Sequence, residues 1–244
     1  MLSLFKSKPK LSELIPSNYI DIHSHVLPGI DDGAKTMSDS ESLLTKMVGL
    51  GFSKVITTPH TMGSVWDNTS ETIKGALQKV HTERPSLAKS VNLQAASEYF
   101  LDENLMHLVQ KNKLLPLKDN YILVEMSYLS APIQLYDFLF ELQLQGYQLV
   151  LAHPERYSFL HANKKEYDKL KKAGCMFQLN LLATVGYYGK EVAEVSDYLL
   201  KQQLYDFVGS DIHHQMHVQS FASKIKISNS TVLEQLISNN QFFK

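Results

Sequence analysis

The sequence predicts an α/β fold in which seven parallel strands close into a TIM-like barrel. Short apolar runs alternate with segments of helical period, and a side chain able to bind a metal stands at the carboxyl end of nearly every run. Strands that alternate with helices pair in parallel. The alternation alone is also compatible with an open doubly wound sheet. We favour the barrel because only a barrel brings all these strand ends around one mouth.

The predicted strands are short, and several are apolar throughout, as expected of strands that are covered on both faces. Residues 122–124 and 149–152 are the clearest examples. The seven predicted strands are residues 20–25, 54–58, 92–97, 121–125, 148–152, 176–180 and 206–210.

The predicted helices fill the intervals between these strands. The first begins at a capping box formed by Ser38 and Glu41, and Gly51 follows its end. The predicted helices are residues 38–50, 71–80, 103–111, 133–145, 164–173, 191–202, 218–225 and 231–238.

The composition indicates an ordinary globular protein. The chain has 244 residues, of which 44% are hydrophobic and 20% charged, which suits one barrel of usual size. We expect residues 1–18 to be an N-terminal extension and residues 19–244 a single domain, because the alternation is never interrupted. A net charge of −1 gives no indication of a nucleic-acid or anionic-membrane partner.

Cys175 is the only cysteine, so the chain has no internal disulfide, which is typical of a reducing compartment. We expect Cys175 to be a buried apolar residue rather than a nucleophile. The apolar runs are too short to cross a bilayer. These features predict a cytoplasmic location without membrane insertion.

Nine nitrogen and oxygen ligands are predicted at the strand ends. His23 and His25 are two residues apart and therefore point to the same side of the first strand, and Asp211 and His213 repeat this spacing at the last strand. Such a set suggests two or three ions, with Mn²⁺, Fe or Zn²⁺ as candidates. The nine residues are His23, His25, Asp32, His60, Glu98, Glu125, His153, Asp211 and His213.

Clustered metal ions at a barrel mouth are typical of hydrolysis. Arg156 follows His153 by three residues, so the same loop carries it toward the mouth. Its planar donor fork suits phosphate oxygens, which favours a phosphate ester as substrate. The alternative is that Arg156 pairs with Glu155 or with another carboxylate on the rim.

Several motifs together resemble the PHP (polymerase and histidinol phosphatase) superfamily, and most closely its bacterial protein-tyrosine phosphatases of capsule and exopolysaccharide loci, the CpsB/YwqE type. The most specific are the Asp-Asp-Gly turn and the His-Pro-Glu-Arg-Tyr run. In chain order, these motifs are His23-Ser24-His25, Gly29-Ile30-Asp31-Asp32-Gly33, Thr58-Pro59-His60, Glu98-Tyr99, Ala152-His153-Pro154-Glu155-Arg156-Tyr157 and Ser210-Asp211-Ile212-His213.

The resemblance implies a distorted (β/α)₇ barrel (the PHP fold) with a trinuclear, Mn²⁺-dependent site at the carboxyl mouth of the strands. It implies a phosphoric monoester hydrolase that dephosphorylates a bacterial tyrosine autokinase controlling polysaccharide export. The same nine residues would be ligands, and Arg156 would bind phosphate. Asp211 and His213 are also expected to be catalytic residues. The expected mechanism is attack by a metal-bound hydroxide without a covalent enzyme intermediate.

The chain departs from this family in one respect that concerns phosphate binding. Some members have a second arginine after the last ligand pair, or basic residues after the second-strand histidine. Residues 214–217 and 61–66 contain neither arginine nor lysine here. Phosphate binding would then rest on the metals and Arg156, together with His214 or His217, although exposed loop positions are the expectation for both histidines.

Aromatic residues near the mouth are candidates for contact with a phosphotyrosine ring. Trp66 and Tyr187 are the ones we single out, ahead of Tyr99, Tyr128 and Tyr188. Two other functions stay open. One is a small-molecule phosphatase, such as a histidinol phosphatase. The other is a non-catalytic metal-binding scaffold that docks a kinase or a polysaccharide-assembly partner.

Overall fold

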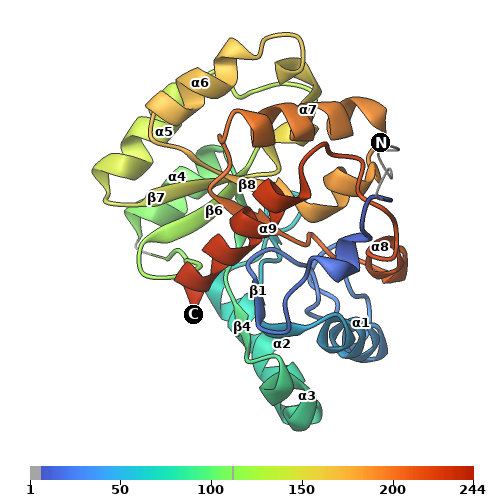
Figure 1. The fold of residues 1–244 in the computed structure, drawn as a ribbon. Helices are drawn as coiled ribbons and strands as arrows, with labels where there is room; N and C mark the ends of the chain where they lie inside the picture. The colour runs from blue at the N-terminus through green and yellow to red at the C-terminus, as the bar shows by residue number, and fades with distance from the viewer. Residues whose placement is uncertain (1–6, 112) are drawn as a thin grey trace, which may run out of the picture.

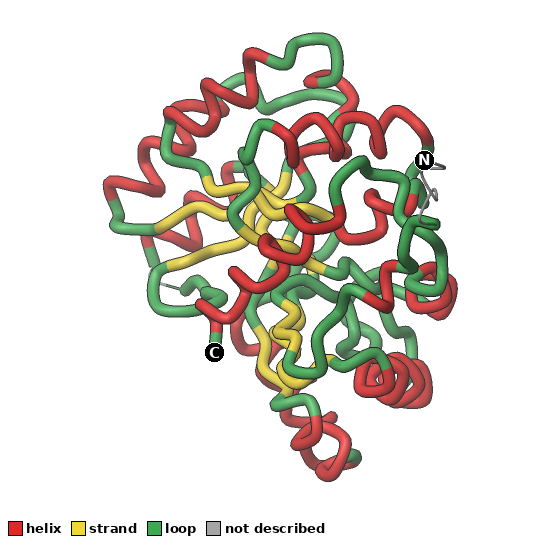
Figure 2. The backbone as a smooth tube through the Cα atoms, viewed as in Figure 1, coloured by secondary structure: helices red, strands yellow, loops and turns green. Residues whose placement is uncertain are grey.

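The computed structural model describes residues 7–111 and 113–244. The first six residues of the predicted N-terminal extension lie outside this range. Two groups of strands occupy the centre of the described chain, and helices surround them (Figure 2). All strand pairs are parallel, as predicted.

The strands form two sheets. The smaller sheet has the order β1 (Tyr19–Asp21), β2 (Phe52–Thr57), β4 (Leu93–Ala95). The larger sheet has the order β3 (His60–Thr61), β5 (Glu98–Phe100), β6 (Tyr121–Glu125), β7 (Gln148–Ala152), β8 (Met176–Asn180), β9 (Phe207–Gly209).

The predicted strands do not close into one barrel, because the described strands form two separate open sheets. The predicted second strand ends at Thr57, one residue early: Thr58 donates its N–H to the carbonyl of Ser24, Pro59 has no N–H to donate, and a separate strand, β3, begins at His60. The predicted third strand likewise ends at Ala95, two residues early, and β5 begins at Glu98 in the larger sheet. Only a single parallel bridge, between Ser24 and Ile212, joins the first and last strand ends.

The helices lie outside the sheets. Figure 1 shows α1, α2 and α3 beside the smaller sheet, and α5, α6 and α7 on the outer side of the larger one. The helices are α1 (Met37–Gly49), α2 (Ser70–Glu83), α3 (Pro85–Ser90), α4 (Glu103–Gln110), α5 (Leu135–Leu144), α6 (Lys165–Lys172), α7 (Lys190–Lys201), α8 (Gln215–Ser220) and α9 (Ser230–Asn239).

The cap of α1 and the start of α8 differ from the prediction. Helix α1 is capped by Thr36 and Asp39 rather than by Ser38 and Glu41: Asp39 donates its N–H to Thr36 Oγ1, and Thr36 donates its N–H to Asp39 Oδ2. The extended backbone of Thr36 explains the shift, since an N-cap residue lies outside helical geometry. Helix α8 begins at Gln215, three residues before the predicted start.

The described part of the predicted extension packs on the C-terminal region. Leu11 is fully buried, and its N–H donates to the carbonyl of Ser223, while Ile225 donates to the carbonyl of Pro9. Cys175 is buried, as expected, and burial raises the pKa of its thiol to about 12. Within residues 7–111 and 113–244, no helix combines the length and the apolar character needed to cross a membrane.

Candidate metal centre

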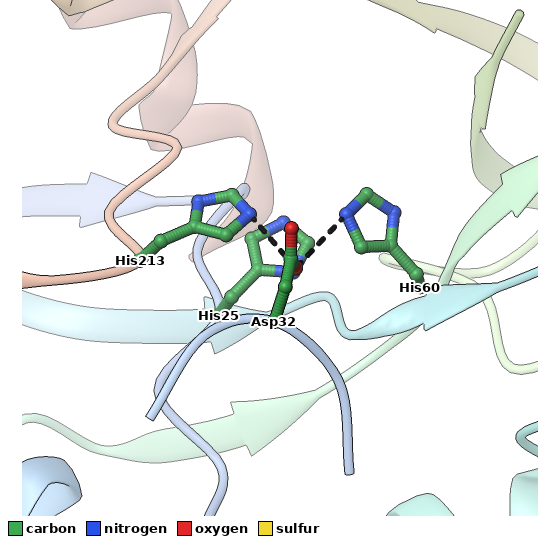
Figure 3. Close-up of side chains that lie close together, drawn as sticks. All are labelled: His25, Asp32, His60 and His213. Carbon is green, nitrogen blue, oxygen red and sulfur yellow. Dashed lines mark ion pairs between the residues drawn. The ribbon is translucent and has the colours of Figure 1, made fainter. Parts of the chain in front are cut away.

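The structure brings all nine predicted ligands together. They form four overlapping groups, and within each group one ligand atom per residue lies within 4.8 Å of the others. Figure 3 shows the first group, with its side chains converging from different elements. The groups are His25, Asp32, His60 and His213; His23, Glu98 and His153; His23, His25 and Asp211; and His60, Glu98 and Glu125.

Buried hydrogen bonds orient the first two imidazoles. His23 Nδ1 lies 2.7 Å from Gln178 Oε1, and His25 Nδ1 lies 2.8 Å from Asp31 Oδ2. In each imidazole the Nδ1 proton is used in a hydrogen bond that points away from the cluster. The lone pair of Nε2 therefore faces the middle of the cluster. Sequence reasoning assigned no role to Gln178 or Asp31. A signal for Gln178 was present, since it is a polar residue inside an otherwise apolar strand.

The Asp-Asp-Gly turn divides two roles between adjacent carboxylates. Asp31 is buried and accepts hydrogen bonds from the backbone N–H groups of Gly33 and His60, in addition to its contact with His25. The Asp32 side chain is 53% exposed and faces His60 Nε2 at 3.4 Å and His213 Nε2 at 3.3 Å. Gly33 is required at the third position, because an added Cβ would collide with the carbonyl oxygen of His25.

Glu98 is the carboxylate at the middle of the cluster. Its Oε2 lies 3.2 Å from His23 Nε2, 3.3 Å from His25 Nε2 and 3.2 Å from His60 Nδ1. Its Oε1 lies 3.1 Å from His153 Nε2. Burial alone would raise the pKa of Glu98, but the surrounding imidazoles hold it well below its usual range. Glu98 is therefore an anion with four imidazoles around it.

The unsatisfied atoms of the cluster fit divalent cations. Within the described chain, several buried side-chain atoms of these residues make no hydrogen bond of regular geometry, although most of them lie within ion-pair distance of one another: His23 Nε2, His25 Nε2, His60 Nδ1, His153 Nδ1 and Glu98 Oε2. Burying a polar atom without a hydrogen bond raises the free energy of the folded state, so native proteins contain few such atoms. Imidazole and carboxylate donors suit Mn²⁺, Fe or Zn²⁺. The residues present could hold more than one such ion.

Asp211 connects this cluster to Arg156. Its Oδ1 lies 3.3 Å from both His23 Nε2 and His213 Nδ1. Its Oδ2 accepts hydrogen bonds from Arg156 Nη1 at 2.8 Å and from Asn180 Nδ2 at 2.7 Å. Burial opposes the charge, yet the neighbouring cationic groups lower the pKa of Asp211. Glu155, the partner considered for Arg156, instead accepts from the Asn180 N–H and the Tyr205 hydroxyl.

Two tyrosines enclose the Arg156 guanidinium. Its Cζ lies 4.4 Å from the ring centroid of Tyr128 and 4.1 Å from that of Tyr188, which are cation–π contacts. These three residues line a pocket of about 250 Å³ over the cluster. The aromatic residues singled out from the sequence, Trp66 and Tyr187, do not line this pocket.

One of the two histidines expected at exposed loop positions is buried instead, and the other is exposed as predicted. His217, expected to be an exposed loop residue, is only 6% exposed and lines the pocket. Its Nδ1 lies 3.0 Å from the carbonyl oxygen of Asp211. His214 is exposed but also lines the pocket, with its ring centroid 3.9 Å from that of His217. His217 faces inward because α8 begins at Gln215, before its predicted start, and includes His217.

The chain matches the family model described as "Capsular polysaccharide synthesis, CpsB/CapC" over residues 19–236. Among curated relatives, the tyrosine-protein phosphatase YwqE of Bacillus subtilis strain 168 is 28% identical over 92% of this chain and 94% of its own. The tyrosine-protein phosphatase CpsB of Streptococcus pneumoniae is 26% identical over 80% of this chain and 83% of its own.

A solved structure is similar over nearly the whole chain. It comes from the crystal structures of YwqE from Bacillus subtilis and CpsB from Streptococcus pneumoniae, described as unique metal-dependent tyrosine phosphatases. The two folds superpose with a TM-score of 0.80 at 28% identity, covering 92% of this chain and 93% of the other. The chain that holds this cluster of nine predicted ligands is thus similar in fold and sequence to metal-dependent tyrosine phosphatases.

Proposed function

We propose that this chain, which belongs to the CpsB/CapC family of capsular polysaccharide synthesis proteins, is a metal-dependent phosphomonoesterase that dephosphorylates phosphotyrosine in proteins. One observation carries the proposal. A cluster of imidazoles and carboxylates with unsatisfied buried atoms lies beside an arginine in the same pocket. Cation ligands next to a guanidinium fork suit a phosphoryl group.

The nine clustered residues would hold two or three divalent cations, for which we propose Mn²⁺, with Fe or Zn²⁺ as alternatives. Glu98 occurs in two of the groups, so it suits a carboxylate that bridges ions. Bound cations supply Lewis acidity at the phosphoryl oxygens and a water-derived nucleophile at neutral pH. For the arrangement that holds them we propose a fold of the PHP type in which the two parallel sheets stay open rather than closing into one barrel.

Arg156 would bind the phosphoryl oxygens. Only its Nη1 has a hydrogen bond to Asp211, and other guanidinium N–H groups remain as donors in the pocket it lines. The rings of Tyr128 and Tyr188 hold the guanidinium plane between them. Asp211 and His213 would act both as ligands and as catalytic residues, because they lie between the cation cluster and Arg156.

No cysteine nucleophile is proposed, since Cys175 is buried in the core outside the pocket. Hydrolysis would therefore proceed without a cysteinyl-phosphate intermediate. As the physiological substrate we propose a bacterial tyrosine autokinase that regulates capsular or exopolysaccharide synthesis, with both proteins in the cytoplasm. The curated relatives support this proposal through their names as tyrosine-protein phosphatases.

The proposal is tested with purified protein and p-nitrophenyl phosphate. We expect EDTA to abolish hydrolysis and Mn²⁺ to restore it, while full activity in thoroughly chelated protein would overturn the metal dependence. Turnover of a phosphotyrosyl peptide compared with histidinol phosphate then separates a protein phosphatase from a small-molecule phosphatase. If His60→Ala had no effect on hydrolysis, the non-catalytic scaffold would be favoured instead.

A further inference from the structure

A second pocket, of about 320 Å³, opens beside the candidate metal centre, between the loop after β6, Met62 just after β3, and Phe100 of β5. We propose that it binds an apolar side chain next to the phosphotyrosine of the substrate protein, an inference that rests on the function proposed above. Its apolar lining consists of Met62, Phe100, Met126, Tyr128 and Leu129, and Glu125 and Ser127 complete it.

The two pockets share one wall. Tyr128 lines both, with its ring 4.4 Å from Arg156 Cζ. Glu125 lines the second pocket, and its Oε1 is 2.8 Å from His60 Nδ1. Because Tyr128 belongs to both pockets, a substrate with its phosphotyrosine over Arg156 has the side chain of a neighbouring residue within reach of the second pocket.

The chemistry of the second pocket selects an apolar occupant. Its one charged lining residue, Glu125, faces His60, and the lining has no lysine, arginine or histidine, so an acidic side chain would find no cationic partner there. Residues 126–136 contain no charged residue at all. Leu129, on the rim, is 81% exposed, and Ile133 farther along the same segment is fully exposed. Covering such side chains would remove apolar surface from water, which favours binding.

The experiment uses the Mn²⁺-loaded protein and a set of phosphotyrosyl pentapeptides. The parent has serine at the two positions on each side of phosphotyrosine. Each other peptide carries one leucine or one glutamate at one of these four positions. We expect leucine at one position to raise kcat/KM about tenfold over the parent, mainly through KM, and glutamate there to lower it.

Leu129→Ser should reduce the preference for leucine to less than twofold. This variant should fold normally, because the side chain is mostly exposed. Leu144→Ser is the matched control: Leu144 is also an exposed leucine, 63% exposed, but it lies at the far end of α5. It should keep the full preference. Met62→Ser gives a second test from the opposite wall. Hydrolysis of p-nitrophenyl phosphate, which has no flanking residues, reports that the metal centre is intact.

Three results would overturn the inference. One is equal kcat/KM for all peptides while phosphotyrosine is still hydrolysed. Another is a leucine preference that survives both Leu129→Ser and Met62→Ser. The third is a dimer in sedimentation that Leu129→Ser dissociates, which would assign the pocket to a second copy of the chain. A loaded enzyme that hydrolyses no phosphotyrosyl peptide would instead overturn the proposed function and the pocket with it.

Discussion

The Arg156 guanidinium and the Asp211 carboxylate are joined by a hydrogen bond of 2.8 Å from Nη1 to Oδ2, while the other carboxylate oxygen faces His23 and His213. One side chain thus belongs to both the cluster of predicted ligands and the pocket that Arg156 lines. Asn180 donates a second hydrogen bond to the same Oδ2. The position of the guanidinium is therefore coupled to the position of a predicted ligand.

Arg156→Lys should lower kcat/KM for a phosphotyrosyl peptide by about 10²- to 10³-fold, because an ammonium group lacks the planar fork and cannot stack between the two tyrosine rings. The Mn²⁺ content should be retained. Arg84 is the other arginine and pairs with Glu41 on the surface, so Arg84→Lys is the matched control. Activity of Arg156→Lys within twofold of the parent would remove Arg156 from the site.

Asp31→Asn should weaken Mn²⁺ binding by about tenfold, since the partner of a metal-binding histidine tunes its basicity and orientation. The one amide oxygen of asparagine can still accept from His25 Nδ1, but the change removes the charge and the second oxygen, which accepts from the Gly33 N–H. Titration of the apoprotein with Mn²⁺ measures the effect. Asp39→Asn alters only the cap of α1 and should bind Mn²⁺ normally. Equal affinities in the two variants would contradict this role of Asp31.

Gly33→Ala should destabilise the protein by about 2 kcal/mol or more and lower its metal content, because the new Cβ would push against the backbone of His25. Gly75 in α2 has open space around an added Cβ. Gly75→Ala should therefore raise stability by about 0.5–1 kcal/mol. Urea unfolding of both variants provides the measurement, and a neutral Gly33→Ala would show that the turn tolerates a side chain.

Removal of metal should lower the melting temperature as well as the activity. Cations that bind only the folded state stabilise it by about 2.7 kcal/mol at a concentration of 100 Kd. The buried ligand atoms without hydrogen-bond partners become unfavourable again in the apoprotein. Thermal melts with EDTA and with increasing Mn²⁺ should therefore differ in a concentration-dependent way. Identical melts would indicate that the cluster binds no ion.

Cys175→Ser should retain activity, and the native thiol should react slowly with DTNB up to pH 9. Burial raises the thiol pKa from 9.0 to about 12, so the fold favours the neutral form. The resulting stability is present below pH 9, the thiol pKa in the unfolded chain, and is lost as the pH rises above it. DTNB kinetics in native and urea-unfolded protein check this. Fast native labelling would contradict the burial.

Much of the fold could be predicted because its signals are local. The strands at 121–125, 148–152 and 176–180 have the predicted bounds, since each is an apolar run between polar turns. The strands β3 and β5 were not predicted, because they are only two and three residues long and too short to show a pattern of their own. The start of α8 at Gln215 was not predicted either. The inward position of His217 depends on that start and was therefore not predicted.

The sequence by itself determined which nine residues gather: the i, i+2 spacing and the strand-end positions are properties of the chain, and the parallel topology carries them to one place. Only the tertiary structure decided which side chains support them. Asp31 and Gln178 hold imidazoles through contacts spanning 6 and 155 positions, and Arg156 stacks between Tyr128 and Tyr188 from different loops. Side-chain direction and long-range packing set these contacts, and no local pattern encodes either.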